Sequence, residues 1–169
     1  MNIKNGNITV NDNINVVLED KVALYIEVDN ETYNKANIIG AHLEGPYLSK
    51  AQAGAQCPNF ITFPKKSEYV PLIDKYGKMI ARWTYAPEND VNGEFAYYLT
   101  KHRIIPSIGH SDATYEDVNK AYKKGANLIT HLYSCTSTIT RNHGFRHLGI
   151  VESSLLLFAS STVSFIGLA

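Results

Sequence analysis

The sequence has few cysteines and no excess of charge of either sign, and both shortages exclude classes of protein. Its 169 residues include two cysteines, Cys57 and Cys135, far apart and in no CxxC pattern. This excludes a disulfide framework and a cysteine zinc site, so a reducing cytoplasm is the expected location. Basic and acidic side chains number 16 each. The chain therefore offers no basic surface for nucleic acid or a membrane, and zero net charge favours a homo-oligomer.

Long apolar runs and a leader segment are also missing. The first ten residues lack the charged-then-apolar layout of a signal peptide. Residues 153–169 carry no charge, but they are rich in serine and threonine and shorter than the roughly 20 apolar residues of a membrane span. We expect a buried element or a broken end there. With 44% apolar residues, the chain can form one ordinary core.

The pattern of apolar residues changes near residue 36. Between residues 8 and 28 apolar and polar residues alternate, which predicts short, antiparallel strands. Further on, short apolar runs alternate with amphipathic segments. Strands are expected over 37–43, 78–85, 104–108 and 127–133. Helices are expected over 68–76 with Ser67 as cap, over 92–102 with Asn92 as cap, and from 114 to 124 with a Thr114–Asp117 capping box.

Alternating strands and helices with short connections predict parallel βα units. The expected class is α/β, with about four βα units after a short N-terminal β segment. We expect two parts, residues 1–35 and residues 36–169. An open parallel sheet and a piece of a (β/α)8 barrel both fit the periodicity.

Polar side chains stand where three of the expected parallel strands end. Glu44, His110 and His131 each follow an apolar run. Chemistry in α/β folds gathers at the carboxyl ends of parallel strands, so these residues should meet. One carboxylate and two imidazoles suit zinc and leave a position open for water. Strand-end residues can equally be capping or core hydrogen-bonding groups, as we expect for His42. Asp112, two residues after His110, could orient a ligand or start the following helix, and we expect the second.

Five short stretches resemble the N-acetylglucosamine-6-phosphate deacetylases of the amidohydrolase superfamily, in order and in spacing. They are His42–Tyr47 (HLEGPY), Ala53–Gln56 (AGAQ), Tyr85–Glu88 (YAPE), Gly109–Ala113 (GHSDA) and Thr130–Tyr133 (THLY). The resemblance covers residues 37–152 and implies a partial (β/α)8 TIM-type barrel. It also implies a divalent metal ion, zinc or else iron, cobalt or manganese, held by Glu44, His110 and His131.

The resemblance implies substrate contacts as well. Ala55 matches a residue that touches the sugar, and Ser134 and Cys135 stand where the family has Asn-Ala. Arg146, or else Arg141, matches an arginine that binds the sugar phosphate across a dimer boundary; a solvated surface arginine is the alternative. The implied reaction is hydrolysis of the acetamido group of N-acetylglucosamine 6-phosphate.

Some features of the family have no match within the chain. No HxH pair precedes the HLEGPY stretch, and the aspartate that transfers the proton would fall after residue 169, so no catalytic residue is expected here. A gene fragment, a frameshift or an internally deleted paralogue would explain this, with little activity and poor stability of the isolated chain. The alternatives are a non-catalytic fragment that binds metal or pairs with a full-length subunit, and another amidohydrolase, a deaminase or cyclic amidase.

Overall fold

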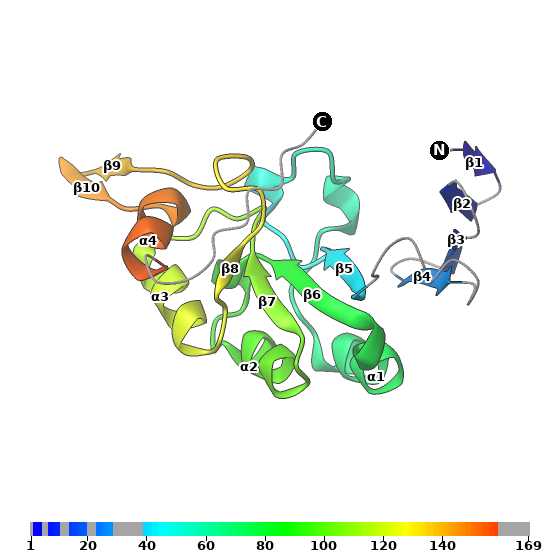
Figure 1. The fold of residues 1–169 in the computed structure, drawn as a ribbon. Coiled ribbons are helices and arrows are strands. Elements are labelled where there is room, and N and C mark those ends of the chain that lie inside the picture. The colour runs from blue at the N-terminus through cyan, green and yellow to red at the C-terminus, as the bar shows by residue number, and fades with distance from the viewer. Residues whose placement is uncertain (1, 5–6, 11–13, 20–22, 29–38, 159–169) are drawn as a thin grey trace.

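The computed structural model describes residues 2–4, 7–10, 14–19, 23–28 and 39–158 (Figure 1). Parts of the strand expected from residue 37 and of the expected uncharged C-terminal segment lie outside these residues. The first four strands form an antiparallel sheet in sequence order, as the alternation over residues 8–28 predicts. They are β1 (Asn2–Lys4), β2 (Asn7–Val10), β3 (Ile14–Glu19) and β4 (Ala23–Val28).

The second sheet is parallel and positions the candidate site. Its strands are β5 (Ala41–Glu44), β6 (Ile80–Tyr85), β7 (Ile105–Ile108) and β8 (Leu128–Ile129), in this order. The helices between them are α1 (Lys66–Tyr76), α2 (Glu94–Lys101) and α3 (Tyr115–Lys123). Glu44 lies opposite Thr84, and Ile108 lies between Tyr85 and Ile129. The strand tips therefore meet at one edge of the sheet, as expected for consecutive βα units.

Aromatic side chains form the core between this sheet and its helices. The Phe95 ring packs against Tyr47, Trp83 and Tyr85 with centroid distances of 5.1, 5.3 and 5.4 Å. The Trp83 indole nitrogen donates to the Gly45 carbonyl oxygen at 2.8 Å. The end of β5 is thus fixed to the core beside Glu44.

Two of the expected helix caps are wrong. Lys65, not Ser67, occupies the cap position of α1, and Ser67 lies inside the helix. Gly93 precedes α2, and the Asp90 carboxylate accepts hydrogen bonds from the backbone nitrogens of Phe95 and Ala96 at 3.1 and 3.0 Å. For α3 the prediction holds, since Asp117 accepts from the Thr114 backbone nitrogen at 3.3 Å.

The loops hold further short elements. Within the described residues, the 3-10 helices are η2 (Lys50–Gln52), η3 (Pro58–Phe60), η4 (Gly77–Met79) and η5 (Pro87–Asn89). β9 (Thr140–Asn142) and β10 (Phe145–His147) form a hairpin in a region where no strand was expected. It extends away from the parallel sheet, at the left of Figure 1.

The last described element is α4 (Ile150–Leu157), capped by Glu152, which accepts from the Gly149 nitrogen at 3.1 Å. In the described part of the expected uncharged segment, Ser153, Ser154 and Phe158 are buried, whereas Leu155 and Leu156 are exposed, so a buried element is borne out only in part. None of the described helices has the length and apolar character needed to cross a membrane.

Candidate metal centre

Glu44, His110 and His131 meet at the carboxyl edge of the parallel sheet. Glu44 is the last residue of β5, and each histidine follows the end of its strand, β7 or β8, by two residues. Oε1 of Glu44 lies 2.7 Å from Nε2 of His110 and 2.9 Å from Nε2 of His131, and the two Nε2 atoms are 3.0 Å apart. Among the described residues, this is the group of three or more His, Cys, Asp or Glu whose geometry could hold a metal ion.

The far side of each imidazole ring fixes which nitrogen faces the cluster. Nδ1 of His110 lies 2.9 Å from the Gln52 carbonyl oxygen, and Nδ1 of His131 lies 2.8 Å from the Ser134 carbonyl oxygen. A carbonyl oxygen only accepts, so each Nδ1 carries the hydrogen, and each Nε2 of a neutral ring presents its lone pair. Two lone pairs and a carboxylate oxygen can therefore converge, an arrangement that could hold a cation.

The electrostatics of the cluster centre on the carboxylate of Glu44. Hydrogen bonding to His110, opposed by partial burial and helped by His131, lowers the pKa of Glu44 to about 2. Burial lowers the pKa of His110, but the bonds to Glu44 and to the Gln52 carbonyl outweigh it and raise the pKa overall. The carboxylate is thus ionised at neutral pH.

The spacing of the three ligand atoms is close to that of a zinc site. With bonds of about 2.0–2.1 Å, tetrahedral ligand atoms stand roughly 3.3 Å apart. The observed distances of 2.7–3.0 Å are shorter by a few tenths of an ångström. A small outward movement of the side chains would therefore admit the ion.

His42 stands apart from the three-residue cluster. Its Nε2 lies 2.6 Å from the Thr84 hydroxyl, which lies 2.6 Å from the Thr130 hydroxyl. Burial, and secondarily the charge of Arg82, lowers the pKa of His42 to about 4 and keeps the ring neutral. The structure thus agrees with a hydrogen-bonded core histidine.

The loop residues expected to touch substrate lie at different distances from the cluster. Ala55 is exposed, and a Cβ on the neighbouring Gly54 would lie 2.6 Å from the Cys135 sulfur and 3.3 Å from Cε1 of His110. The 54–55 turn, Cys135 and the His110 ring are therefore adjacent. The Ser134 carbonyl holds His131, and the Cys135 carbonyl accepts from the Ser111 nitrogen at 3.1 Å.

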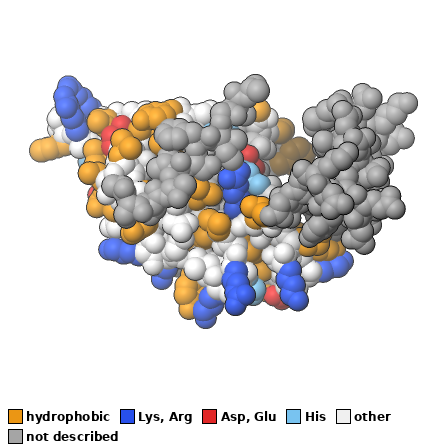
Figure 2. Space-filling model, in the orientation of Figure 1, with side chains coloured by type: hydrophobic (Ala, Val, Ile, Leu, Met, Phe, Trp, Pro, Cys, Tyr) orange, Lys and Arg blue, Asp and Glu red, His pale blue; other side chains and the backbone are white. Residues whose placement is uncertain are grey.

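The expected phosphate-binding arginine is not brought to the cluster within this chain. Arg146 and the alternative, Arg141, face each other across the β9–β10 hairpin and are exposed. Figure 2 shows basic side chains over this hairpin, at the upper left.

Sequence reasoning assigned no role to Glu88, which contacts the segment that follows His110. Glu88, which ends the YAPE stretch, accepts from the Ser111 hydroxyl and the Asp112 nitrogen. Asp112 does not start α3, whose cap is Thr114, but accepts from the Gln52 side-chain amide at 3.0 Å. The available signal for Glu88 was its place after a strand, the same signal that indicated Glu44.

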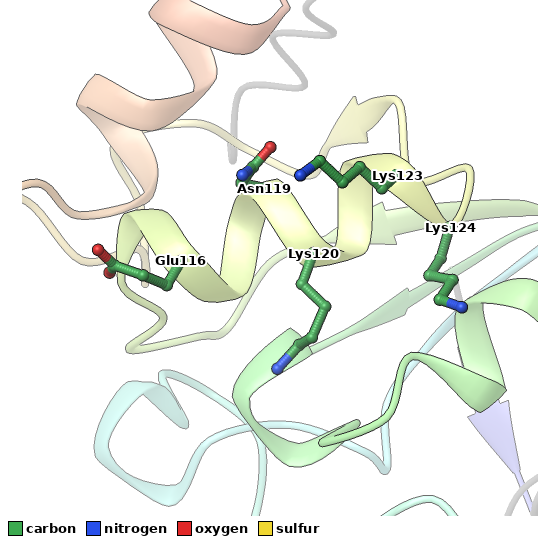
Figure 3. Close-up of a pocket in the computed structure, with 5 residues that line it drawn as sticks. All are labelled: Glu116, Asn119, Lys120, Lys123 and Lys124. Atoms are coloured by element: carbon green, nitrogen blue, oxygen red, sulfur yellow. The ribbon is translucent and has the colours of Figure 1, made fainter.

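A surface groove of about 320 Å³ lies elsewhere, on α3 (Figure 3). It is lined by Glu116, Asn119, Lys120, Lys123 and Lys124, and none of the cluster residues lines it.

Comparison with known proteins relates the chain to N-acetylglucosamine-6-phosphate deacetylases. No family model matches the chain. It is 38% identical to the N-acetylglucosamine-6-phosphate deacetylase of Lysinibacillus sphaericus over 126 residues, which are 75% of this chain and 32% of that protein. It is 34% identical to the Haemophilus influenzae deacetylase over 138 residues, 82% of this chain and 34% of that protein. The chain spans about a third of the length of these curated relatives.

Solved structures of the same name share the fold. The Pasteurella multocida deacetylase superimposes with a TM-score of 0.64 at 31% identity, covering 74% of this chain and 32% of that one. A Mycobacterium smegmatis variant, solved in complex with N-acetyl-D-glucosamine-6-phosphate, gives 0.65 at 30% identity, covering 73% and 31%. The expected fold class is confirmed, because the parallel sheet and its helices match part of the barrel of these structures.

Proposed function

This chain is a partial relative of the N-acetylglucosamine-6-phosphate deacetylases, and on that premise we propose that Glu44, His110 and His131 bind the divalent metal ion of such an enzyme. The observation that carries the proposal is the convergence of one carboxylate oxygen and two imidazole Nε2 atoms within 3.0 Å of one another. The carbonyl oxygens behind both rings support it, because they turn the lone pairs toward the cluster.

Zinc is the ion that we propose, with iron, cobalt and manganese as alternatives. Two imidazoles and a carboxylate are a frequent catalytic zinc set, and three protein ligands leave one position open. When bound, such an ion lowers the pKa of water to about 7 and polarises a carbonyl. The chain's own residues hold the ion, and the ionised Glu44 offsets part of its charge.

The proposed substrate is a sugar phosphate, N-acetylglucosamine 6-phosphate, which would yield glucosamine 6-phosphate and acetate. Ala55, Ser134 and Cys135 would contact the sugar from the two loops beside His110. In a homodimer, Arg146 would reach the sugar phosphate bound to the second copy. Its exposed position on a projecting hairpin is suitable for that contact. Its planar guanidinium can hold two phosphate oxygens at once.

Turnover requires a group that moves a proton from water to the leaving amine. The resemblance places the corresponding aspartate after residue 169, so we propose that residues 39–158 supply the metal and sugar contacts rather than the proton transfer. We also retain the division at residues 35 and 36 as a proposal, which limited proteolysis would test. A reducing cytoplasm remains the proposed location, and it suits the free thiols Cys57 and Cys135.

Zinc titration of the metal-free chain by calorimetry tests the proposal. We expect one ion per chain and at least a hundredfold loss of affinity in Glu44→Gln, His110→Asn and His131→Asn. Glu116→Gln and His102→Asn change exposed residues to the same amides and should bind zinc as the wild type does. Equal affinity in all five variants would refute the site, and acetate release by the wild type would separate an enzyme from a non-catalytic metal-binding chain.

A further inference from the structure

Glu88 is a half-buried carboxylate beside the candidate metal centre, and the proposed chemistry gives it no task. It lies in η5, directly after β6. Its Oε2 accepts from the Ser111 hydroxyl at 2.5 Å, and its Oε1 accepts from the Asp112 backbone nitrogen at 2.7 Å. Ser111 and Asp112 are the two residues after His110, so Glu88 fixes the segment that carries this proposed metal ligand.

Ser111 joins the loops of the two histidines. Its backbone nitrogen donates to the Cys135 carbonyl at 3.1 Å, and its carbonyl accepts from the Ser137 nitrogen at 3.1 Å. Cys135 lies in the loop of residues 131–135, which begins with His131. Nδ1 of His131 is hydrogen-bonded to the Ser134 carbonyl oxygen of the same loop. The bond between Ser111 and Glu88 therefore anchors both loops at one point.

Asp112 connects the same carboxylate to the back of the His110 ring. Its nitrogen donates to Glu88, while its side chain accepts from the Gln52 amide at 3.0 Å. The Gln52 carbonyl accepts from Nδ1 of His110 at 2.9 Å. This chain of bonds turns Nε2 of His110 toward Glu44.

The backbone at these loops needs such support. His110 has φ of 48°, His131 34° and Cys135 51°, all in the left-handed region. Non-glycine residues adopt this region only at a cost in free energy, and they keep it when surrounding bonds fix them.

We propose that Glu88 is a positioning residue of the metal centre, which holds His110 and His131 in their ligating arrangement through Ser111 and Asp112. The inference rests on the proposed metal-binding function of Glu44, His110 and His131. It adds a residue that touches neither the ion nor the substrate.

The energetics of Glu88 separate positioning from plain stabilisation. Burial raises the pKa of Glu88, and the bonds from Ser111 and Asp112 offset this only in part. The ionised carboxylate is thus disfavoured by its surroundings, and replacing it with a neutral isostere removes that cost. A glutamine, however, cannot accept from both donors. Glu88→Gln should therefore leave the metal-free chain as stable as before, or more stable, while disturbing the His110 segment.

Zinc affinity and metal-free stability of the full chain, measured together, test the proposal. Groups that orient metal ligands change affinity by about 10–100-fold when replaced. We expect Glu88→Gln and Ser111→Ala to weaken zinc binding about tenfold. The visible spectrum of the Co²⁺-loaded chain should change in both variants, and the melting temperature of the metal-free Glu88→Gln chain should not fall. Glu116→Gln, the same change at an exposed helix position, is the control.

Three results would count against this role. Wild-type zinc affinity in Glu88→Gln, or in Ser111→Ala if the first variant does not fold, overturns it. So does a fall in metal-free stability as large as the loss in affinity, because a merely structural residue would behave in that way. A wild-type chain that binds no zinc overturns the proposed metal site itself, and this inference with it.

Discussion

At the residue scale, Gly109 explains why the GHSDA stretch brings its histidine close to Glu44. A Cβ at this position would lie 2.9 Å from Cβ of Thr130 and 3.0 Å from Cγ2 of Thr84. Both contacts are shorter than packed carbon atoms allow, so glycine lets the end of β7 lie against its neighbouring strands. The next residue, His110, is thereby brought beside Glu44.

Gly109→Ala should destabilise the chain by about 1–3 kcal/mol, the usual cost of forcing an extra carbon into a packed site. It should also weaken zinc binding, because the end of β7 must move. Urea denaturation of the metal-free variant measures the first effect. Gly77→Ala, whose added carbon would lie no closer than 3.2 Å to Ile73, should cost less. An equal cost at both glycines would contradict this explanation.

Tyr69 gives a second prediction at this scale, on pH. Its ring is 2% exposed, and burial, followed by the charges of Asp90 and Glu94, raises the pKa of its hydroxyl to about 12 from 10.0. A group with a raised folded-state pKa contributes stability that is present below the unfolded value and is lost as pH rises through the folded one. Stability should therefore fall between about pH 10 and 12.

The stability of Tyr69→Phe should fall less steeply over that pH window, as urea midpoints at several pH values would show. Burial raises the pKa of Tyr85 as well, so part of the dependence should persist. Tyr133→Phe, at a residue 66% exposed, is the control. An unchanged slope in Tyr69→Phe would contradict the assignment.

At the scale of elements, helix α2 shows where sequence reasoning succeeds and where it fails. The amphipathic pattern placed the helix within two residues at its start, because apolar spacing dictates which face is buried. It chose Asn92 as the cap, whereas Asp90 accepts the two backbone bonds. Both residues suit a cap in type, and only the path of the chain before the helix decides between them.

Asp90→Ala should therefore destabilise the chain by about 1–2 kcal/mol, the cost of losing a cap that serves two backbone nitrogens. Asn92→Ala should change the free energy of unfolding by less than about 0.5 kcal/mol, as surface substitutions usually do. Urea denaturation of both variants decides the matter. The reverse order of losses would show that Asn92 is the cap after all.

Contacts between distant elements explain what the sequence could not predict at the candidate site. The strand ends at Glu44, His110 and His131 are marked by apolar runs, and the first two also by glycine or proline, so their meeting follows from the parallel sheet. The bonds Gln52–Asp112 and Glu88–Ser111 join residues 60 and 23 positions apart, in loops without periodicity. The β9–β10 hairpin was missed because its strands are three residues long and β10 is exposed throughout.

For the molecule as a whole, the parallel sheet has two open sides among the described residues. There β5 pairs with β6 alone and β8 with β7 alone, so their outer backbone groups are free to pair elsewhere. Exposed strand edges promote association. We expect the purified chain to self-associate, which sedimentation or light scattering would detect. A monomer with a single sharp melting transition in calorimetry would contradict this.

The central claim is that Glu44, His110 and His131 share one divalent cation. Anomalous diffraction at the zinc edge, from crystals of the zinc-loaded chain, tests it most directly. The account predicts a single strong peak within bonding distance of Oε1 of Glu44 and of the Nε2 atoms of His110 and His131. A peak at other residues, such as His143 and His147 of the hairpin region, with none between these three atoms, would contradict it.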